Sequence, residues 1–208
     1  MEIAGIAIGV TEATREELEE HRRYAEILGA EFVNARIVAP MGSDVVDSFA
    51  HCAEVFAAVG ARIALEFSRG TTLRGIPDAR HLLEAAGTTD AGITLDTWHF
   101  FLAESGPDWE ALEALPHAQF ANVQLSDGVP YAEGAFGRAT MNERRLPGDG
   151  GFDFARAGRV LDQMGFDQNG QGAVVVEVLS AEWRARPVAD FAKAAMTASR
   201  SVLNRSRG

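Results

Sequence analysis

Short apolar runs alternate evenly with longer segments of helical periodicity, and this alternation is the feature that most limits what the chain can fold into. The runs span residues 3–10, 31–38, 61–67, 91–98, 120–127 and 172–179. The first five recur about every thirty residues, which is the length of one βαβ unit. Such alternation predicts a parallel sheet with helices packed outside it. Because runs such as AVVVEV are almost wholly apolar, we expect both faces of their strands to be covered.

Six predicted strands with intervening helices indicate an α/β fold, a TIM-type (β/α) barrel with about six of the usual eight βα units. An open, doubly wound sheet is less favoured, because GVTEAT follows the first run in place of a glycine-rich phosphate loop. With 208 residues, 47% of them hydrophobic, we expect one domain over residues 1–208. An incomplete barrel exposes strand edges, so we also expect a homo-oligomer.

Charge and cysteine content exclude several classes of protein. The chain has 30 acidic against 19 basic residues and no basic run with interleaved aromatic residues, which disfavours a nucleic-acid partner. No stretch approaches the ~18 apolar residues of a membrane span, and the first residues do not resemble a signal peptide. Cys52 is the only cysteine, so a cytoplasmic location fits, and its apolar neighbours predict a buried, unreactive thiol.

The polar residues that close the predicted strands are the candidates for chemistry, because reacting groups in such barrels lie at the carboxyl ends of strands. We predict that Glu66, Asp96, Gln124 and Glu177 hold one divalent ion. Oxygen ligands favour Mg²⁺ or Mn²⁺, with Co²⁺ or Zn²⁺ as alternatives. A buried carboxylate needs a cation, and the opposing interpretation is that each acid pairs with an arginine or caps a helix. Four successive strand ends make separate coincidences hard to accept.

Residues just beyond these strand ends are candidates for contact with a substrate. His99 lies three residues after Asp96, and we predict that it contacts substrate or acts as acid or base. Trp98 would form a wall of a sugar pocket, with a place in the core as the alternative. Asp127 closes the fifth run and is a further candidate for substrate binding.

One long connection, residues 128–151, follows the Gln124 strand and is predicted to be an extended loop. Connections of more than ~12 to 15 residues are commonly lids or binding loops. Arg144 and Arg145 lie in it, and arginines beside an acidic site can hold carboxylate, phosphate or hydroxyl groups. We therefore predict that both bind substrate, with charge compensation at the surface as the alternative.

Five motifs, ALEF, LDTWHF, VQLSDG, RRLPGDGGFD and VVVEV, resemble in order and spacing those of the xylose isomerase-like TIM-barrel family, which includes sugar phosphate isomerases and epimerases. The resemblance implies that Glu66, Asp96 and Glu177 are metal ligands and that His99 contacts substrate. It implies a sugar-like or hydroxylated keto substrate. It also implies a reaction in which Glu66 and Glu177 move a proton through a metal-stabilised enediolate.

Two departures from the family pattern keep other functions open. Many members have a histidine at the position of Gln124, whereas members similar to 3-dehydroshikimate dehydratases have glutamine there, so a metal-dependent dehydratase is an alternative. The resemblance begins at the family's third strand, which also leaves open an inactive barrel with a binding or scaffold role. Repair of abasic DNA, which occurs in the wider barrel family, needs a multi-zinc histidine cluster and a basic groove, and the sequence shows neither.

Overall fold

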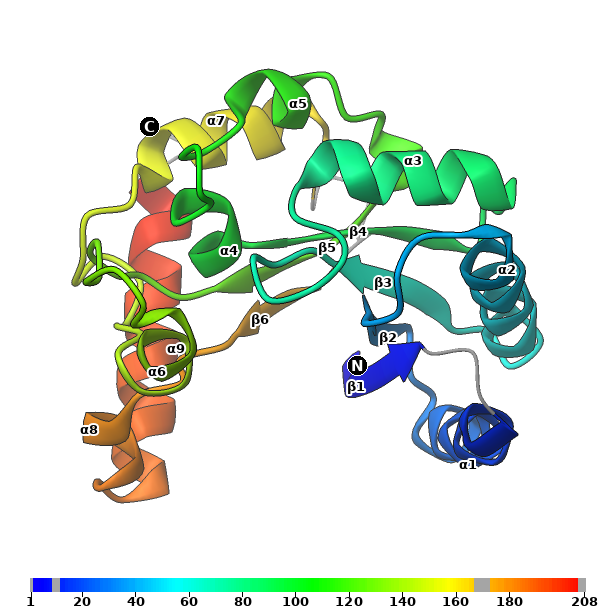
Figure 1. Ribbon diagram of the computed structural model, residues 1–208. Coiled ribbons are helices and arrows are strands. Elements are labelled where there is room, and N and C mark those ends of the chain that lie inside the picture. Colours follow the sequence, from blue (N-terminus) through cyan, green and yellow to red (C-terminus); the bar gives the residue numbers. More distant parts are fainter. Residues whose placement is uncertain (1, 9–11, 167–172, 206–208) are drawn as a thin grey trace. The chain divides into compact units, whose positions relative to one another are not determined.

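The computed structural model describes residues 2–8, 12–166 and 173–205, and its strands and helices alternate as the sequence predicts (Figure 1). The strands are β1 (Glu2–Ile8), β2 (Phe32–Ile37), β3 (Arg62–Glu66), β4 (Ala91–Asp96), β5 (Phe120–Leu125) and β6 (Val174–Val176). The helices are α1 (Glu12–Leu28), α2 (Ser43–Ala57), α3 (Ile76–Ala86), α4 (Thr97–Phe101), α5 (Trp109–Glu113), α6 (Phe136–Asn142), α7 (Phe154–Gln163), α8 (Ala181–Arg184) and α9 (Val188–Arg205), with a short 3₁₀ helix at His117–Gln119. Residues 9, 10 and 172 of the predicted runs lie outside the described residues.

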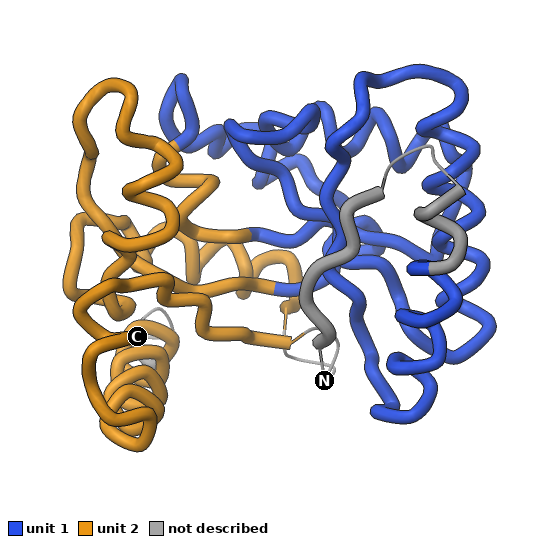
Figure 2. Tube along the Cα trace, turned by 60° about the horizontal axis from the view of Figure 1, so that its bottom comes forward, with its two compact units in different colours: residues 1–95, 103–122 blue, residues 96–102, 123–208 orange. Residues whose placement is uncertain are grey.

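The six strands follow one another in the sheet in chain order. The pairs β1/β2, β2/β3, β3/β4 and β5/β6 are parallel, with Arg36 opposite Glu66 and Glu66 opposite Thr94. This arrangement confirms the predicted α/β fold with a parallel sheet. The chain groups into two compact units, unit 1 (Met1–Leu95 and Ala103–Asn122) and unit 2 (Asp96–Leu102 and Val123–Gly208), coloured separately in Figure 2. The prediction of a single domain stays a prediction.

Unit 1 is built on strands β1 to β4, and α2 packs against both β3 and α3. The buried side of α2 carries Val45, Phe49, Cys52 and Phe56, at the three- and four-residue spacing of one helix face. Cys52 lies inside this apolar layer, where burial raises the pKa of its thiol to about 11. The predicted buried thiol is therefore confirmed.

In unit 2 the last part of β5 pairs with β6, with Val123 opposite Val174. The expectation that AVVVEV is covered on both faces is wrong for β6, because Val174 is 37% exposed and Val175 and Val176 are half-buried. Among the described strands β6 is the last in the sheet order, so it has one strand neighbour. Helix α9 contacts β6, and Leu146, Val178 and Ala195 form a small apolar core there.

Two short helices of unit 2, α4 and α6, stand where the sequence predicts strand or loop. Residues 128–151 do not form one extended loop, because α6 lies within them and a backbone bridge joins Asp127 to Arg145. Helix α4 begins at Thr97, although the predicted run continues to residue 98. Helices of five to seven residues, such as α4 and α6, are too short to show periodicity in the sequence. No helix in the described part of the chain is long and apolar enough to span a membrane.

Candidate functional site

Asp96 is the last residue of β4 and also the N-cap of α4. Its Oδ1 accepts hydrogen bonds from the backbone N–H groups of Trp98 at 2.7 Å and His99 at 3.4 Å. Aspartate is among the best N-cap residues because its carboxylate satisfies N–H groups that the first turn leaves open. This cap turns the chain sharply at the strand end and holds His99 within 3.7 Å of the Asp96 Oδ2 atom.

Arg144 brings the neighbouring Asp96 and His99 together with Glu177, which lies far from them in the sequence. Its side chain is 2% exposed, and Nη1 donates to the Asp96 Oδ2 at 2.9 Å. The same nitrogen lies 3.7 Å from the Glu177 Oε2, while Nη2 lies 3.5 Å from the His99 Nε2. Nε donates to the backbone oxygen of Thr140 at 3.2 Å, which fixes the plane of the guanidinium. Arg144, Asp96, His99 and Glu177, here called the arginine cluster, therefore meet in unit 2.

The charges of the arginine cluster differ in their access to solvent. Burial alone raises the pKa of Asp96, but the guanidinium of Arg144, followed by the imidazole of His99, outweighs it and holds the pKa below its usual value. Asp96 is 1% exposed, whereas the Glu177 side chain is 30% exposed. Glu177 follows directly after β6, as predicted for a strand-end residue. It is the carboxylate of this cluster that a ligand can reach.

Glu66 ends β3 in unit 1 and is buried there. Its Oε2 accepts a hydrogen bond from the Nδ2 of Asn34 at 3.0 Å, and Asn34 is itself buried in β2. Our sequence reasoning missed Asn34, although a single amide within the apolar run FVNARIV was a usable signal. Glu66, Asp96 and His99 are all buried and each offers a ligand atom for a metal ion. Gln124 is buried in β5, and its predicted role as a ligand stays a prediction.

Asp127 has a different environment from that predicted for a substrate-binding residue. Its buried carboxylate accepts four backbone hydrogen bonds, from Gly128, Gly148, Gly150 and Phe152, at distances of 2.7 to 3.1 Å. These donors occupy both carboxylate oxygens. The contacts support a structural role for Asp127, and its contact with a substrate stays a prediction.

The two remaining candidates, Trp98 and Arg145, lie in different surroundings. Trp98 is fully buried, stacks on Tyr131 with ring centroids 6.1 Å apart, and donates from Nε1 to Thr140. This environment supports the core interpretation of Trp98. Arg145 is exposed and donates to the backbone oxygen of Asp149 at 3.2 Å, away from the cluster that holds Arg144. Their predicted contacts with substrate stay predictions.

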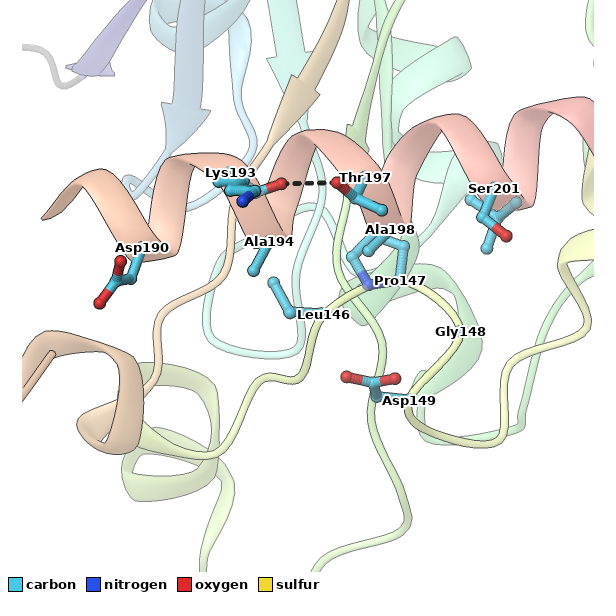
Figure 3. A pocket seen from close by; sticks show the side chains of 11 residues that line it. Leu146, Pro147, Gly148, Asp149, Asp190, Lys193, Ala194, Thr197, Ala198 and Ser201 are labelled. Atoms are coloured by element: carbon cyan, nitrogen blue, oxygen red, sulfur yellow. Dashed lines mark hydrogen bonds between the residues drawn. The ribbon is translucent and has the colours of Figure 1, made fainter. Parts of the chain in front are cut away.

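A separate groove of about 530 Å³ in unit 2 runs between α9 and the turn that starts at Leu146 (Figure 3). Asp149 and Asp190 lie along it with Lys193, and the Thr197 hydroxyl donates to the Lys193 backbone oxygen at 2.8 Å. None of the predicted site residues lines this groove. The turn therefore has the groove on one side and the carboxylate of Asp127 bonded to its backbone.

The family with the description "Xylose isomerase-like TIM barrel" matches residues 5–201. The chain therefore belongs to this family, which confirms the resemblance seen in its motifs. A comparison with curated proteins finds no match.

Solved structures show the same fold at low sequence identity. The IOLI protein "with a binding zinc atom" has a TM-score of 0.82 and 18% identity, over 99% of this chain and 75% of that chain. An L-ribulose 3-epimerase has a TM-score of 0.73 and 18% identity over the same shares. The D-allulose 3-epimerase of Methylomonas sp. in complex with D-allulose has a TM-score of 0.62 and 19% identity, over 82% of this chain and 57% of that chain. Such identities establish the fold alone.

Proposed function

We propose that the chain is a divalent-metal-dependent isomerase or epimerase of sugar-like keto substrates that acts by removing a proton next to a carbonyl group. The observation that carries this proposal is the arginine cluster, in which a buried guanidinium lies between Asp96 and Glu177 and beside His99. Ionisable groups that gather at strand ends are typical of active sites in this fold. The sugar epimerases among the similar structures support the same class of substrate.

The donor atoms fit a divalent cation. In the arginine cluster two carboxylates face one guanidinium, which leaves one formal negative charge when His99 is neutral. In unit 1, Glu66 offers a further buried carboxylate. We propose that Glu66, Asp96, Gln124 and Glu177 hold the ion, with His99 as a further candidate. Carboxylate and amide oxygens favour Mg²⁺ or Mn²⁺, while the imidazole also suits Co²⁺ or the zinc that the IOLI structure contains.

The ion when bound would supply Lewis acidity, which polarises a carbonyl group of the substrate. Glu177 is the partly exposed carboxylate, so we assign it the removal of the proton from the carbon beside the carbonyl. Arg144, fixed by Asp96 and Thr140, donates hydrogen bonds to the oxygen on which negative charge develops. Glu66 returns a proton to that carbon from the other side, and His99 holds a substrate hydroxyl.

The test is turnover of D-allulose and L-ribulose with Mn²⁺ in D₂O, followed by NMR. An epimerase incorporates solvent deuterium at the carbon beside the carbonyl. Glu177→Gln keeps the shape of the side chain but removes the base, so we expect kcat to fall by about 10²- to 10⁴-fold. Glu182→Gln, a change at an exposed residue of α8, is the matched control and leaves kcat unchanged. Wild-type protein that turns over no keto sugar with Mn²⁺, Mg²⁺, Co²⁺ or Zn²⁺ contradicts the proposal.

A dehydratase remains the alternative. Gln124 is buried in β5, and members similar to 3-dehydroshikimate dehydratases have glutamine at this position, whereas many other family members have histidine. Loss of water from 3-dehydroshikimate, assayed beside the keto sugars, distinguishes the two reactions. Calorimetry with Mn²⁺ tests the third interpretation, an inactive scaffold, for which Glu177→Gln leaves the affinity for Mn²⁺ unchanged.

Self-association is also part of the proposal. Strand β6 is the last described strand in the sheet order, and its Val174 is exposed. Unpaired strand edges favour pairing with another chain. Sedimentation velocity over a range of concentrations tests it, and a purely monomeric species at all of them contradicts it.

A further inference from the structure

We propose that Asp127 is a positioning residue that fixes which of two adjacent arginines enters the candidate active site. The inference deepens the proposed function and rests on it only for the effect on catalysis. The carboxylate of Asp127 is buried, and its four hydrogen-bond donors are backbone N–H groups.

The four donors come from two segments of the chain. Oδ1 accepts from Gly128 at 2.7 Å and from Phe152 at 3.1 Å. Oδ2 accepts from Gly148 at 2.9 Å and from Gly150 at 3.0 Å. The carboxylate therefore closes the turn Leu146–Phe152 onto the end of β5. Hydrogen bonds to an ionised acceptor are roughly twice as strong as neutral ones, so a single charge organises this turn.

The same residue pairs with Arg145 through its backbone. The Asp127 N–H donates to the Arg145 oxygen at 2.9 Å, and the Arg145 N–H donates to the Asp127 oxygen at 2.8 Å. In extended backbone successive side chains point to opposite sides. This pairing therefore sends Arg145 to the exposed side and Arg144 into the arginine cluster. A slip of one residue would exchange the two guanidinium groups.

Close contacts around Asp127 and Arg144 restrict how the turn and the Arg144 segment can pack. A Cβ atom at Gly150 would overlap Oδ1 of Asp127 and the backbone of Gly128, so the turn closes only when residue 150 is glycine. On the other edge the Arg144 N–H donates to the Leu179 oxygen at 3.2 Å. The segment that contains Arg144 is thus held on both sides, and the Asp127 side depends on one carboxylate.

Chemical modification of arginine tests the proposal without any assay of activity. Phenylglyoxal labels exposed guanidinium groups, and tandem mass spectrometry separates Arg144 from Arg145. In the wild-type protein we expect Arg145 to be labelled and Arg144 to be protected. Asp127→Asn removes the charge and replaces one oxygen, which accepts two hydrogen bonds, by a donor. We expect labelling of Arg144 to rise at least about tenfold, since loss of even one hydrogen bond to a charged group changes an equilibrium by roughly that factor. Asp149→Asn changes an exposed carboxylate of the same turn and leaves the labelling as in wild type.

A second variant guards against simple unfolding. Gly150→Ala keeps every charge but pushes the turn away from Asp127, so it also raises the labelling of Arg144 while circular dichroism shows a folded protein. Protection of Arg144 in folded Asp127→Asn and Gly150→Ala overturns the proposal. So does rapid hydrogen exchange of the Gly148, Gly150 and Phe152 amides in the wild type.

The effect on catalysis separates this proposal from the proposed function. If both hold, Asp127→Asn lowers kcat/KM in step with the exposure of Arg144, and Asp149→Asn does not. Wild-type protein without turnover, combined with the expected labelling, contradicts the proposed function and leaves the role of Asp127 intact.

Discussion

The carboxyl ends of β3 and β4 make an instructive comparison, because each is an apolar strand that ends on a buried acid. At the end of β3, Glu66 accepts a hydrogen bond from the neutral amide of Asn34, 32 residues earlier in the chain. At the end of β4, Asp96 is paired with the guanidinium of Arg144, 48 residues later. The same local pattern therefore meets a neutral amide donor at Glu66 and a full positive charge at Asp96.

Cys52 extends the comparison to a buried acid that sits among apolar side chains. Burial raises the pKa of its thiol to about 11, whereas the charge of Arg144 reverses this tendency at Asp96. Burial by itself thus keeps an acid neutral, and a buried anion requires a cation supplied by the fold or by the solvent. Glu66, Asp96 and Cys52 represent three ways in which the fold treats a buried acid, and substitution and alkylation distinguish them.

The largest effect is expected from Arg144→Met, which leaves Asp96 and Glu177 without their guanidinium. Removing one partner of a buried ion pair costs about 3–5 kcal/mol. Urea denaturation without metal measures this loss of unfolding free energy. Because a divalent cation can replace the missing charge, saturating Mn²⁺ is expected to raise the melting temperature of the variant more than that of the wild type.

Arg145→Met is the matched control for that change, since its side chain is exposed. Surface substitutions of this kind usually change stability by less than about 0.5 kcal/mol. Equal losses in the two variants would show that the contrast between the adjacent arginines has no energetic basis.

An intermediate effect is expected at Cys52. At pH 8 its alkylation by iodoacetamide in the native protein should be at least about a hundredfold slower than in urea, because raising the thiol pKa from roughly 8.5 to about 11 lowers the thiolate fraction by more than that factor. The folded pKa is raised, so the stability contributed by the neutral thiol is fully present below the unfolded pKa, roughly 8.5. It is lost as the pH rises through about 11. Equal rates in the native and unfolded protein would contradict the burial of this thiol.

The smallest effect is expected from Asn34→Ala, which removes a neutral donor from Glu66. A lost hydrogen bond to a buried group costs about 1–2 kcal/mol, less than the loss of a full ion pair. Urea denaturation of this variant beside Arg144→Met measures the difference between compensation by a dipole and by a charge. A larger loss for Asn34→Ala than for Arg144→Met would reverse the ranking.

Much of the fold could be predicted because its determinants are local. The strand ends at Glu66 and Asp96 follow from apolar runs that stop at an acid, and Gly87, with a φ of 62°, ends α3 as expected of a C-terminal glycine. The covering of β6 was predicted incorrectly, because the sequence of a strand does not show how many strands lie beside it.

The candidate site could be predicted only in part, since its partners depend on contacts between distant segments. Arg144 and Arg145 are indistinguishable in the sequence, yet one is buried and the other exposed, and the difference comes from backbone pairing with Asp127. The role of Asp127 was hidden for the same reason, because three of its four donors are backbone N–H groups of a turn 21 to 25 residues away.

The double use of Asp96, as the cap of α4 and as a member of the arginine cluster, has a consequence for evolution. A lineage that gave up catalysis would still be under selection to keep this aspartate, because the helix start and the orientation of His99 depend on it. The partly exposed Glu177 does not cap α4. Under the proposed function, loss of Glu177 would therefore be an earlier sign of lost catalysis in a descendant than loss of Asp96.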